Sequence, residues 1–219
     1  MMLSKVVSLI EGLTSSAIGP SPKFDEYHVI KLLMVLLKEG YIGRIRLSKI
    51  LMLGEGSTRT LISRVKSLGL VEESRKGCSL TPSGREVAEV IASKISCMVG
   101  VPVEGFGISG IGVGVLVKGA PPKVDVVKLR DEAIRRGAKA LITMLLVKGK
   151  LTMPTVEEDV MARWPEVSRY IFDAVKPQEG DAILIGIADE YSMAERGALM
   201  AAWSLAFKQD GLVNASSTS

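Results

Sequence analysis

The chain has 219 residues, of which 47% are hydrophobic and 24% charged, an ordinary balance for a globular protein that buries a core. Its length suits two domains of about 100 residues each. The longest apolar runs, such as residues 140–147, are too short to cross a bilayer, and the N-terminus lacks a secretory-signal layout, so we expect a cytoplasmic protein with no membrane partner.

Cysteine and histidine are scarce. Cys78 and Cys97 are the only cysteines and His28 is the only histidine. Zinc sites of the usual kind need more such ligands, and a chain of this size needs no disulfide framework. We therefore expect no metal, no cofactor and reduced cysteines.

The net charge of +4 is unevenly distributed. Residues 1–98 carry 14 Lys and Arg against 9 Asp and Glu, a net of +5, whereas residues 99–219 carry 14 against 15, a net of −1. Between Arg44 and Lys66 there are six basic residues against Glu55 alone. This excess indicates an anionic partner for the N-terminal half, although a solvated charged face is the alternative.

The first 53 residues are expected to be mostly helical. Apolar residues at helical spacing predict a helix over residues 3–13, and a second should start at Ser21 or Pro22 and stop at Gly40. After an extended piece at 41–42, residues 47–53 should form a helix of about two turns.

A third core helix should be capped by Ser57 and run to about Leu68. Leu61, Val65 and Leu68 form its apolar stripe. Its other side carries hydrogen-bond donors, namely Arg59, Ser63 and Lys66 flanked by Thr60, Arg64 and Ser67.

Two short alternating segments follow, joined by a turn with Arg75 and Lys76 at its tip, which predicts a β-hairpin. Thr81 and Pro82 then have the features of a helix cap and first helical position. That helix is expected to reach Met98, with an apolar stripe of Val87, Ile91, Ile95 and Met98.

This order of elements, with the junction SLGLVEES and the segment LTPSGREV, resembles the winged helix-turn-helix of transcription regulators over roughly Lys23 to Lys94. The resemblance implies a recognition helix from Ser57 that enters the major groove, and hairpin residues that approach phosphates or the minor groove. The expected DNA-binding residues are Ser57, Thr58, Arg59, Thr60, Ser63, Arg64, Lys66, Arg75 and Lys76.

Within this set, Arg59 and Arg64 are candidates for sequence specificity, because an arginine bidentate to guanine contributes about 1–3 kcal/mol of discrimination. Arg75 and Lys76 are candidates for affinity. Winged helices also serve as protein-binding modules, so a protein or RNA partner is the alternative to double-stranded DNA.

The second half opens with a glycine-rich stretch, Gly105 to Gly114. A dinucleotide-binding loop would need a helix directly after it, but these glycines pass into an apolar strand and then Pro121 and Pro122. We therefore interpret the stretch as a bent or bulged strand where another backbone or a ligand comes close.

The next elements should be a helix over 125–137 and a hairpin of residues 140–147 and 150–154. Helical structure is expected over 155–174, interrupted near Pro165, and then a buried strand over 181–189. The last helix should start with a capping box of Ser192 and Glu195 and reach Phe207. The chain is thus expected to be α+β: a winged helix-turn-helix (1–98), then a small α+β domain (99–210) with about four strands and two or three covering helices, and a disordered tail (211–219).

The C-terminal half is similar to an archaeal group in which a winged helix precedes a domain of uncharacterised function, whose fold is like the small inserted domain of some aspartyl-tRNA synthetases. That likeness implies a ligand-sensing or dimerising role and no reaction.

Carboxylates at Asp181, Asp189 and Glu190 have no histidine, cysteine or metal-ligand partner nearby in sequence, so we expect no enzyme. Asp189, Glu190, Tyr191 and Ser192 lie where a strand ends and a helix begins, a common ligand position in α/β sheets. The simpler interpretation makes them cap and loop residues. Trp164 and Trp203 are expected in the core or an interface.

The leading hypothesis is a DNA-binding regulator, homodimeric, whose C-terminal domain senses a small-molecule effector or pairs the subunits. An RNA-associated or protein-scaffolding factor is the second hypothesis. An enzyme tethered to the winged helix is the third.

Overall fold

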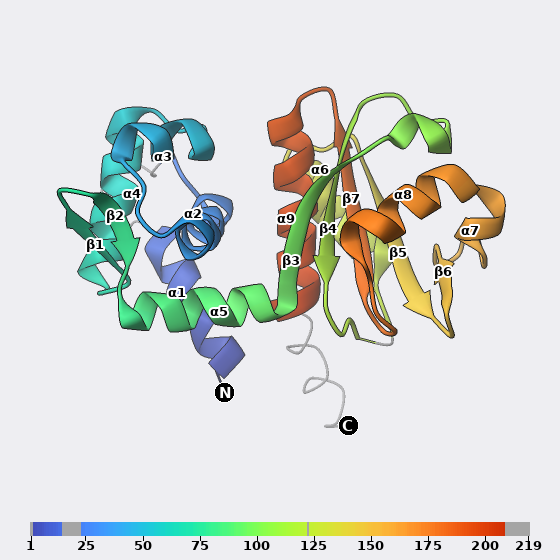
Figure 1. The fold of residues 1–219 in the computed structure, drawn as a ribbon, viewed down its shortest axis with the longest axis horizontal. Helices are drawn as coiled ribbons and strands as arrows, with labels where there is room; N and C mark the ends of the chain where they lie inside the picture. Colours follow the sequence, from blue (N-terminus) through green and yellow to red (C-terminus); the bar gives the residue numbers. More distant parts are fainter. Residues whose placement is uncertain (1, 15–22, 122, 209–219) are drawn as a thin grey trace, which may run out of the picture. The chain divides into compact units, whose positions relative to one another are not determined.

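The computed structural model describes residues 2–14, 23–121 and 123–208, and the chain divides into two compact units between Ser93 and Lys94 (Figure 1). The sequence placed this boundary after Met98. The expected tail over 211–219 lies outside the described residues. The helix start expected at Ser21 or Pro22 is wrong, because residues 23–25 are not helical and the second helix starts at Glu26. Within the described ranges, no helix combines the length and the apolar character that a membrane span requires.

The N-terminal unit consists of helices and one hairpin. Its elements are α1 (Met2–Thr14), α2 (Glu26–Glu39), α3 (Arg44–Leu51), α4 (Glu55–Ser67), β1 (Val71–Ser74), β2 (Gly77–Leu80) and α5 (Pro82–Lys94).

The start of α2 uses the single histidine of the chain. The Nδ1 of His28 lies 2.7 Å from Oδ1 of Asp25, and the Asp25 backbone N–H donates to the same nitrogen at 3.1 Å. Nδ1 forms one of these bonds at a time: unprotonated it accepts from the Asp25 N–H, and protonated it donates to the Asp25 carboxylate. Either bond ties the His28 ring to the N-terminal end of the helix. His28 therefore has a capping role in this fold.

The starts of α3 and α4 differ from the sequence expectation. Helix α3 begins at Arg44 rather than at residue 47, and α4 begins at Glu55. The predicted cap at Ser57 is wrong: the N-cap is Gly54, whose carbonyl accepts the backbone N–H of Thr58 at 2.9 Å. Ser57 instead lies in the first turn of α4.

The predicted hairpin is present, with Val71 opposite Leu80 and Ser74 opposite Gly77. The extended piece before α3 adds a bridge, because Ile42 and Cys78 exchange two backbone hydrogen bonds of 3.0 and 2.9 Å. Gly77 has φ +124°, and a Cβ there would lie 2.7 Å from the Ile42 carbonyl carbon. Glycine is thus required where the hairpin meets the bridge.

Helix α5 starts as predicted: Pro82 is its first residue and the hydroxyl of Thr81 accepts the backbone N–H of Gly84 at 3.0 Å. It ends at Lys94, however, and the expected continuation to Met98 is wrong. Ile95–Val101 forms strand β3, which pairs along its length with Ile111–Val117.

The C-terminal unit is built on one antiparallel sheet of five strands in the order β3-β4-β7-β5-β6. The mixed α+β class is as predicted, with one more strand, β3, than the four expected. After β3 the elements are a 3-10 turn η1 (Val103–Phe106), β4 (Ile111–Val117), α6 (Val126–Arg135), β5 (Ala140–Val147), β6 (Lys150–Thr152), α7 (Val160–Arg163), α8 (Pro165–Val175), β7 (Ala182–Ala188) and α9 (Tyr191–Phe207).

Helices cover both faces of this sheet (Figure 1). Val113 of β4 and Ala188 of β7 pack with Ala194 of α9 on one face, and α6 packs against α9. Side chains of the other face, such as Ile185, cluster with Ile171 of α8. The alternation of side chains along each strand separates these two cores.

The glycine-rich stretch is a strand, as expected, because Gly112 and Gly114 lie within β4. A Cβ on Gly112 would lie 2.3 Å from a methyl carbon of Val103. In β7, a Cβ on Gly186 would lie 2.3 Å from the carbonyl oxygen of Ala194. Glycine therefore lets η1 and α9 approach the strands closely.

The tightest contact of this type predicts a stability effect. A Cβ on Gly84 of α5 would lie 1.8 Å from the Leu70 carbonyl oxygen, so Gly84→Ala must separate α5 from the start of the hairpin. We expect a loss of about 3 kcal/mol in the free energy of unfolding, measured by urea titration with circular dichroism. The control is Gly56→Ala in α4, where no atom lies within 4 Å and stability should not fall. Equal stability of the two variants would contradict the close contact.

Candidate nucleic-acid interface

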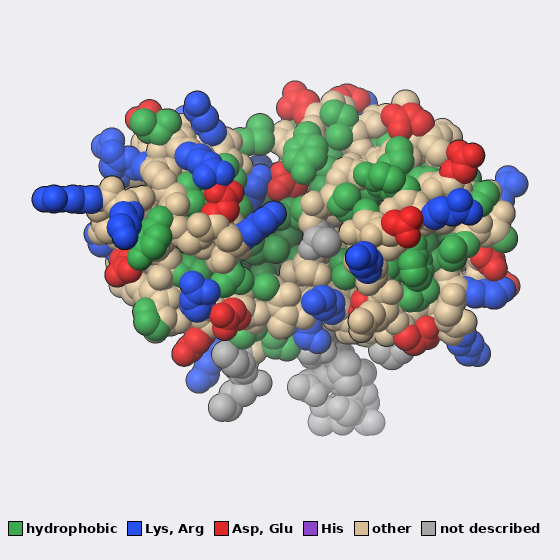
Figure 2. Space-filling model, viewed as in Figure 1, with side chains coloured by type: hydrophobic (Ala, Val, Ile, Leu, Met, Phe, Trp, Pro, Cys, Tyr) green, Lys and Arg blue, Asp and Glu red, His purple; other side chains and the backbone are tan. Residues whose placement is uncertain are grey.

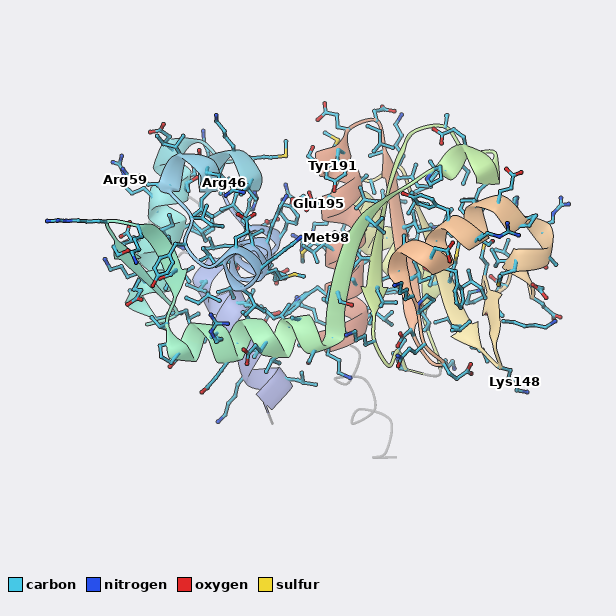
Figure 3. The ribbon with its side chains drawn as sticks, in the orientation of Figure 1. Arg46, Arg59, Met98, Lys148, Tyr191 and Glu195 are labelled. Carbon is cyan, nitrogen blue, oxygen red and sulfur yellow. The ribbon has the colours of Figure 1, made fainter. Side chains whose placement is uncertain are left out.

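Helix α4 presents a polar, solvent-exposed side. Leu61, Ile62 and Val65 are buried, whereas Arg59 and Ser63 are exposed. Thr60 and Lys66 are also exposed, although the Thr60 hydroxyl donates to the Gly56 carbonyl at 3.0 Å. Figure 3 shows Arg59 projecting from α4 away from the body of its unit. The amphipathic pattern of the sequence thus predicted the exposed face of this helix. The place of Leu68 in the apolar stripe was wrong, because Leu68 is the C-cap and 49% of its surface is exposed.

Thr58 does not belong to that exposed face. Its side chain is completely buried, and its hydroxyl donates to the Gly54 carbonyl at 3.1 Å. The expected contact of Thr58 with DNA is incompatible with this position, because the hydroxyl has no access to a ligand.

Arg64 also differs from the expectation. It is half-buried, its Nη1 donates to the Leu13 carbonyl of α1 at 3.0 Å, and its guanidinium lies 5.4 Å from the ring centroid of Phe24. Two interactions stabilise this arrangement: the cation–π contact with Phe24, and the hydrogen bond to a carbonyl in the last turn of α1. Arg64 therefore attaches α1 to α4, and its assignment as a base-reading arginine is corrected.

The hairpin has charges of both signs. Arg75 and Lys76 are exposed in its turn, as predicted, and Lys76 Nζ lies 5.7 Å from the ring centroid of Tyr41. On β1, Glu73 pairs with Lys66 of α4 at 3.3 Å. The positive potential of the hairpin is therefore concentrated at its tip.

Sequence reasoning missed a basic group at the start of α3. Gly43, Arg44, Ile45, Arg46 and Lys49 line a shallow cavity of about 550 Å³. Arg46, labelled in Figure 3, is paired with Glu39 at 2.7 Å. Arg44 and Lys49 are exposed and form no ion pair with a described residue. The signal was present in the charge count between Arg44 and Lys66, but it was assigned to α4 alone.

These cations lie on several elements of one unit, α3, α4 and the hairpin. Figure 2 shows Lys and Arg side chains projecting from this unit. Exposed guanidinium and ammonium groups with hydroxyls between them can bind phosphates and base edges.

Cys78 lies in the middle of this region but is chemically protected. It is a free cysteine with 3% of its surface exposed, and burial, with a smaller effect of Glu73, raises its pKa to about 11. The thiol is therefore neutral at physiological pH and unsuited to metal binding or nucleophilic chemistry.

The residues at the end of β7 are mostly surface groups. Asp189 pairs with Lys139, and Glu190 is the N-cap of α9 without a side-chain capping bond. The predicted capping box of Ser192 is wrong, because α9 already starts at Tyr191 and Glu195 is buried. Partial burial, followed by the charge of Glu195, raises the pKa of Tyr191. Ligand binding at Asp189 to Ser192 stays a prediction.

Asp181, a third carboxylate of interest, has a structural role. It is buried, and its two oxygens accept the backbone N–H groups of Gly119 and Gln178, both at 2.9 Å. This agrees with its interpretation as a turn residue before a strand. Trp203 is fully buried in α9 and stacks on Phe207, as expected of a core residue.

The different positions of Arg59 and Arg64 predict different effects on stability. Arg64→Ala removes a bond to a helix C-terminus and a cation–π contact, and should lower the free energy of unfolding by about 1–2 kcal/mol. Arg59→Ala, on the exposed side of the same helix, should change it by less than about 0.5 kcal/mol. Urea unfolding of both variants measures the difference, and a larger loss for Arg59→Ala would contradict these assignments.

Cys78 predicts a dependence of stability on alkaline pH. In the unfolded chain the thiol ionises near its ordinary pKa of 9.0, but in the folded chain only near 11, so unfolding releases a proton between these values. Stability is unaffected by this group below pH 9 and falls above it, by up to about 1.4 kcal/mol per pH unit. The wild-type chain should therefore lose stability between pH 9 and 11 more steeply than Cys78→Ala. Parallel curves from urea titrations would contradict the raised pKa.

Comparison with known proteins finds a similar domain for each unit. Residues 28–86 match the model of the PH0730-like N-terminal domain, and residues 108–205 match a domain of unknown function, DUF4443. A solved structure, the hypothetical protein PH0730 from Pyrococcus horikoshii OT3, is similar with 29% identity and a TM-score of 0.70, over 85% of this chain and 95% of that chain. No protein with a curated description matches. The chain is thus similar, over both units, to PH0730 from Pyrococcus horikoshii.

Proposed function

We propose that the N-terminal unit is a winged helix-turn-helix that binds double-stranded DNA, and that the protein is a transcription regulator whose C-terminal unit senses a ligand or pairs two subunits. The observation that carries the proposal is the exposed polar side of α4 with Arg59. Further exposed cations lie on α3 and at the hairpin tip of the same unit. The match to the PH0730-like N-terminal domain names no function.

The dimensions of α4 suit the major groove. Its 13 residues span about 20 Å, and a groove about 12 Å wide admits one helix. In this arrangement Arg59 and Ser63 face base edges, while Thr60 and Lys66 lie beside them. Arg59 is the arginine of α4 that remains free for specificity, since Arg64 binds the Leu13 carbonyl.

Phosphate contacts would come from two other places. Arg44 and Lys49 of α3 are exposed cations on one side, and Arg75 and Lys76 of the hairpin are exposed cations on another. Lys66 contributes less, because Glu73 neutralises it in the free protein. Four such contacts would dominate the salt dependence of binding.

The test is binding to labelled genomic fragments at several salt concentrations. We expect log affinity to fall with log salt, and the slope to decrease by about 1.8 in Arg75→Ala/Lys76→Ala, since each lost phosphate contact changes it by about 0.9. Arg44→Ala/Lys49→Ala should behave similarly. Arg59→Ala should reduce discrimination between specific and random fragments by about 1–3 kcal/mol.

The matched control is Arg135→Ala, which removes an exposed arginine of the C-terminal unit that pairs with Glu132 at 3.3 Å. It should leave binding unchanged. Binding that is indifferent to salt, or identical effects of Arg59→Ala and Arg135→Ala, would refute the proposal. Displacement of the DNA by duplex RNA at equal concentration would favour the second candidate, an RNA-associated factor.

A further inference from the structure

The outer edge of β5 is only half covered by its neighbour. Strand β6 is three residues long and pairs with β5 from Leu145 to Val147, whereas β5 starts at Ala140. After Thr152 the chain leaves the sheet, and Pro154 has no N–H with which to continue the pairing. Beyond the end of β6 the structure contains a cavity of about 440 Å³.

The walls of this cavity are mostly apolar and come from elements far apart in the sequence. The lining includes the buried Ile142 and the half-buried Phe106 and Trp164. Val127 of α6 and Val156 also line it, with 54% and 71% of their surfaces exposed. The Phe106 and Trp164 rings form an edge-to-face pair with centroids 5.5 Å apart. A volume of this size and an apolar lining are typical of small-molecule sites.

One wall is held in a fixed conformation. Met153 and Glu157 exchange backbone hydrogen bonds of 2.8 and 3.0 Å, which close the turn between them. Within it Thr155 has φ +66°, a conformation that is uncommon for a β-branched residue. The structure thus maintains a strained turn at the cavity, as is frequent at ligand sites.

Three polar side chains line the cavity, and the hydroxyl of one of them, Thr155, donates to the Pro154 carbonyl at 2.6 Å. The other two, Thr143 and Arg130, have capacity for a ligand. Thr143 is 92% buried, being 8% exposed, and its hydroxyl has no hydrogen-bond partner among the described residues. The hydroxyl oxygen is not among the fully buried polar atoms that lack a partner, so it is accessible from the cavity and can bond to a ligand there. Arg130 is the one charged residue of the lining, and its contact with the neighbouring Asp131, at 3.6 Å, leaves most of its donors unused.

We propose that this cavity binds a small carboxylate with a branched or aromatic apolar body. The apolar body would fill the space beside Trp164 and Ile142, and the carboxylate would accept hydrogen bonds from Thr143 and Arg130. The binding itself is independent of the DNA proposal. Only its role as the effector of a regulator rests on that proposed function.

The experiment uses the full chain without DNA and the probes phenylacetate, 3-phenylpropionate, isovalerate and hexanoate at millimolar concentration. At least one should raise the melting temperature in a saturable way, because a ligand that prefers the folded state stabilises it. The corresponding amide should bind at least about tenfold more weakly, since it lacks the charge that pairs with Arg130. No saturable binding by any of the four acids would overturn the proposal.

Variants assign the site. Thr143→Val keeps the shape of the side chain and should weaken the probe about tenfold, as should Arg130→Gln. Arg135→Gln, on the same helix but outside the cavity, should leave affinity unchanged. Equal affinity in all three variants would overturn the proposal.

The two tryptophans provide an independent readout. Trp164 lines the cavity, whereas Trp203 is fully buried in α9. Of the two indole N–H signals in a nitrogen-15 correlation spectrum, the one that Trp164→Phe removes should shift with the probe and the other should not. A shift confined to Trp203 would place the probe elsewhere and refute the site. Because none of these measurements contains DNA, their outcome is separate from that of the DNA titration.

Discussion

Close approach of one backbone to another, at positions where only glycine fits, underlies the packing of both units. Gly84 brings α5 against the Leu70 carbonyl, and Gly186 brings β7 against the Ala194 carbonyl of α9. In each case a single Cβ would occupy space already held by a backbone oxygen, which cannot rotate away as a side chain can. The hairpin of the first unit and the α9 face of the second depend on these contacts, and with them the elements that carry the candidate sites.

Burial and pairing reduce the set of cations in the N-terminal unit that can meet a partner. Of the six basic residues between Arg44 and Lys66, Arg46 and Lys66 are paired with glutamates and Arg64 binds the end of α1. Arg44, Lys49 and Arg59 remain, together with the hairpin tip. The cationic surface available for the proposed DNA binding is therefore smaller than the net charge indicates, and it includes α3.

The C-terminal unit owes the cavity beside Thr143 to an unequal strand pair. If β6 continued along all of β5, side chains and backbone would close the space beside Thr143; because β6 ends at Thr152, the sheet edge stays open between α6 and Trp164. Such a unit joined to a DNA-binding unit would have the parts of a ligand-responsive regulator. Of the two candidate ligand sites in this unit, we prefer the cavity to the end of β7, because Asp189 at the end of β7 is already paired with Lys139.

Local sequence determined most elements of this protein. Apolar periodicity, Thr81 before Pro82, and the turn at Lys148 and Gly149 depend on neighbouring residues. The body and the end of α2, the start of α5 and the β5–β6 hairpin could therefore be predicted. Tertiary structure decided the rest. Residues 95–101 fit either period and became a strand through pairing with β4. Arg64 turned inward because Leu13, 51 positions away, offers a carbonyl there, and the cavity exists only where α6, β5 and Trp164 meet. Contacts between distant segments leave no periodic pattern, which is why the sequence alone did not reveal them.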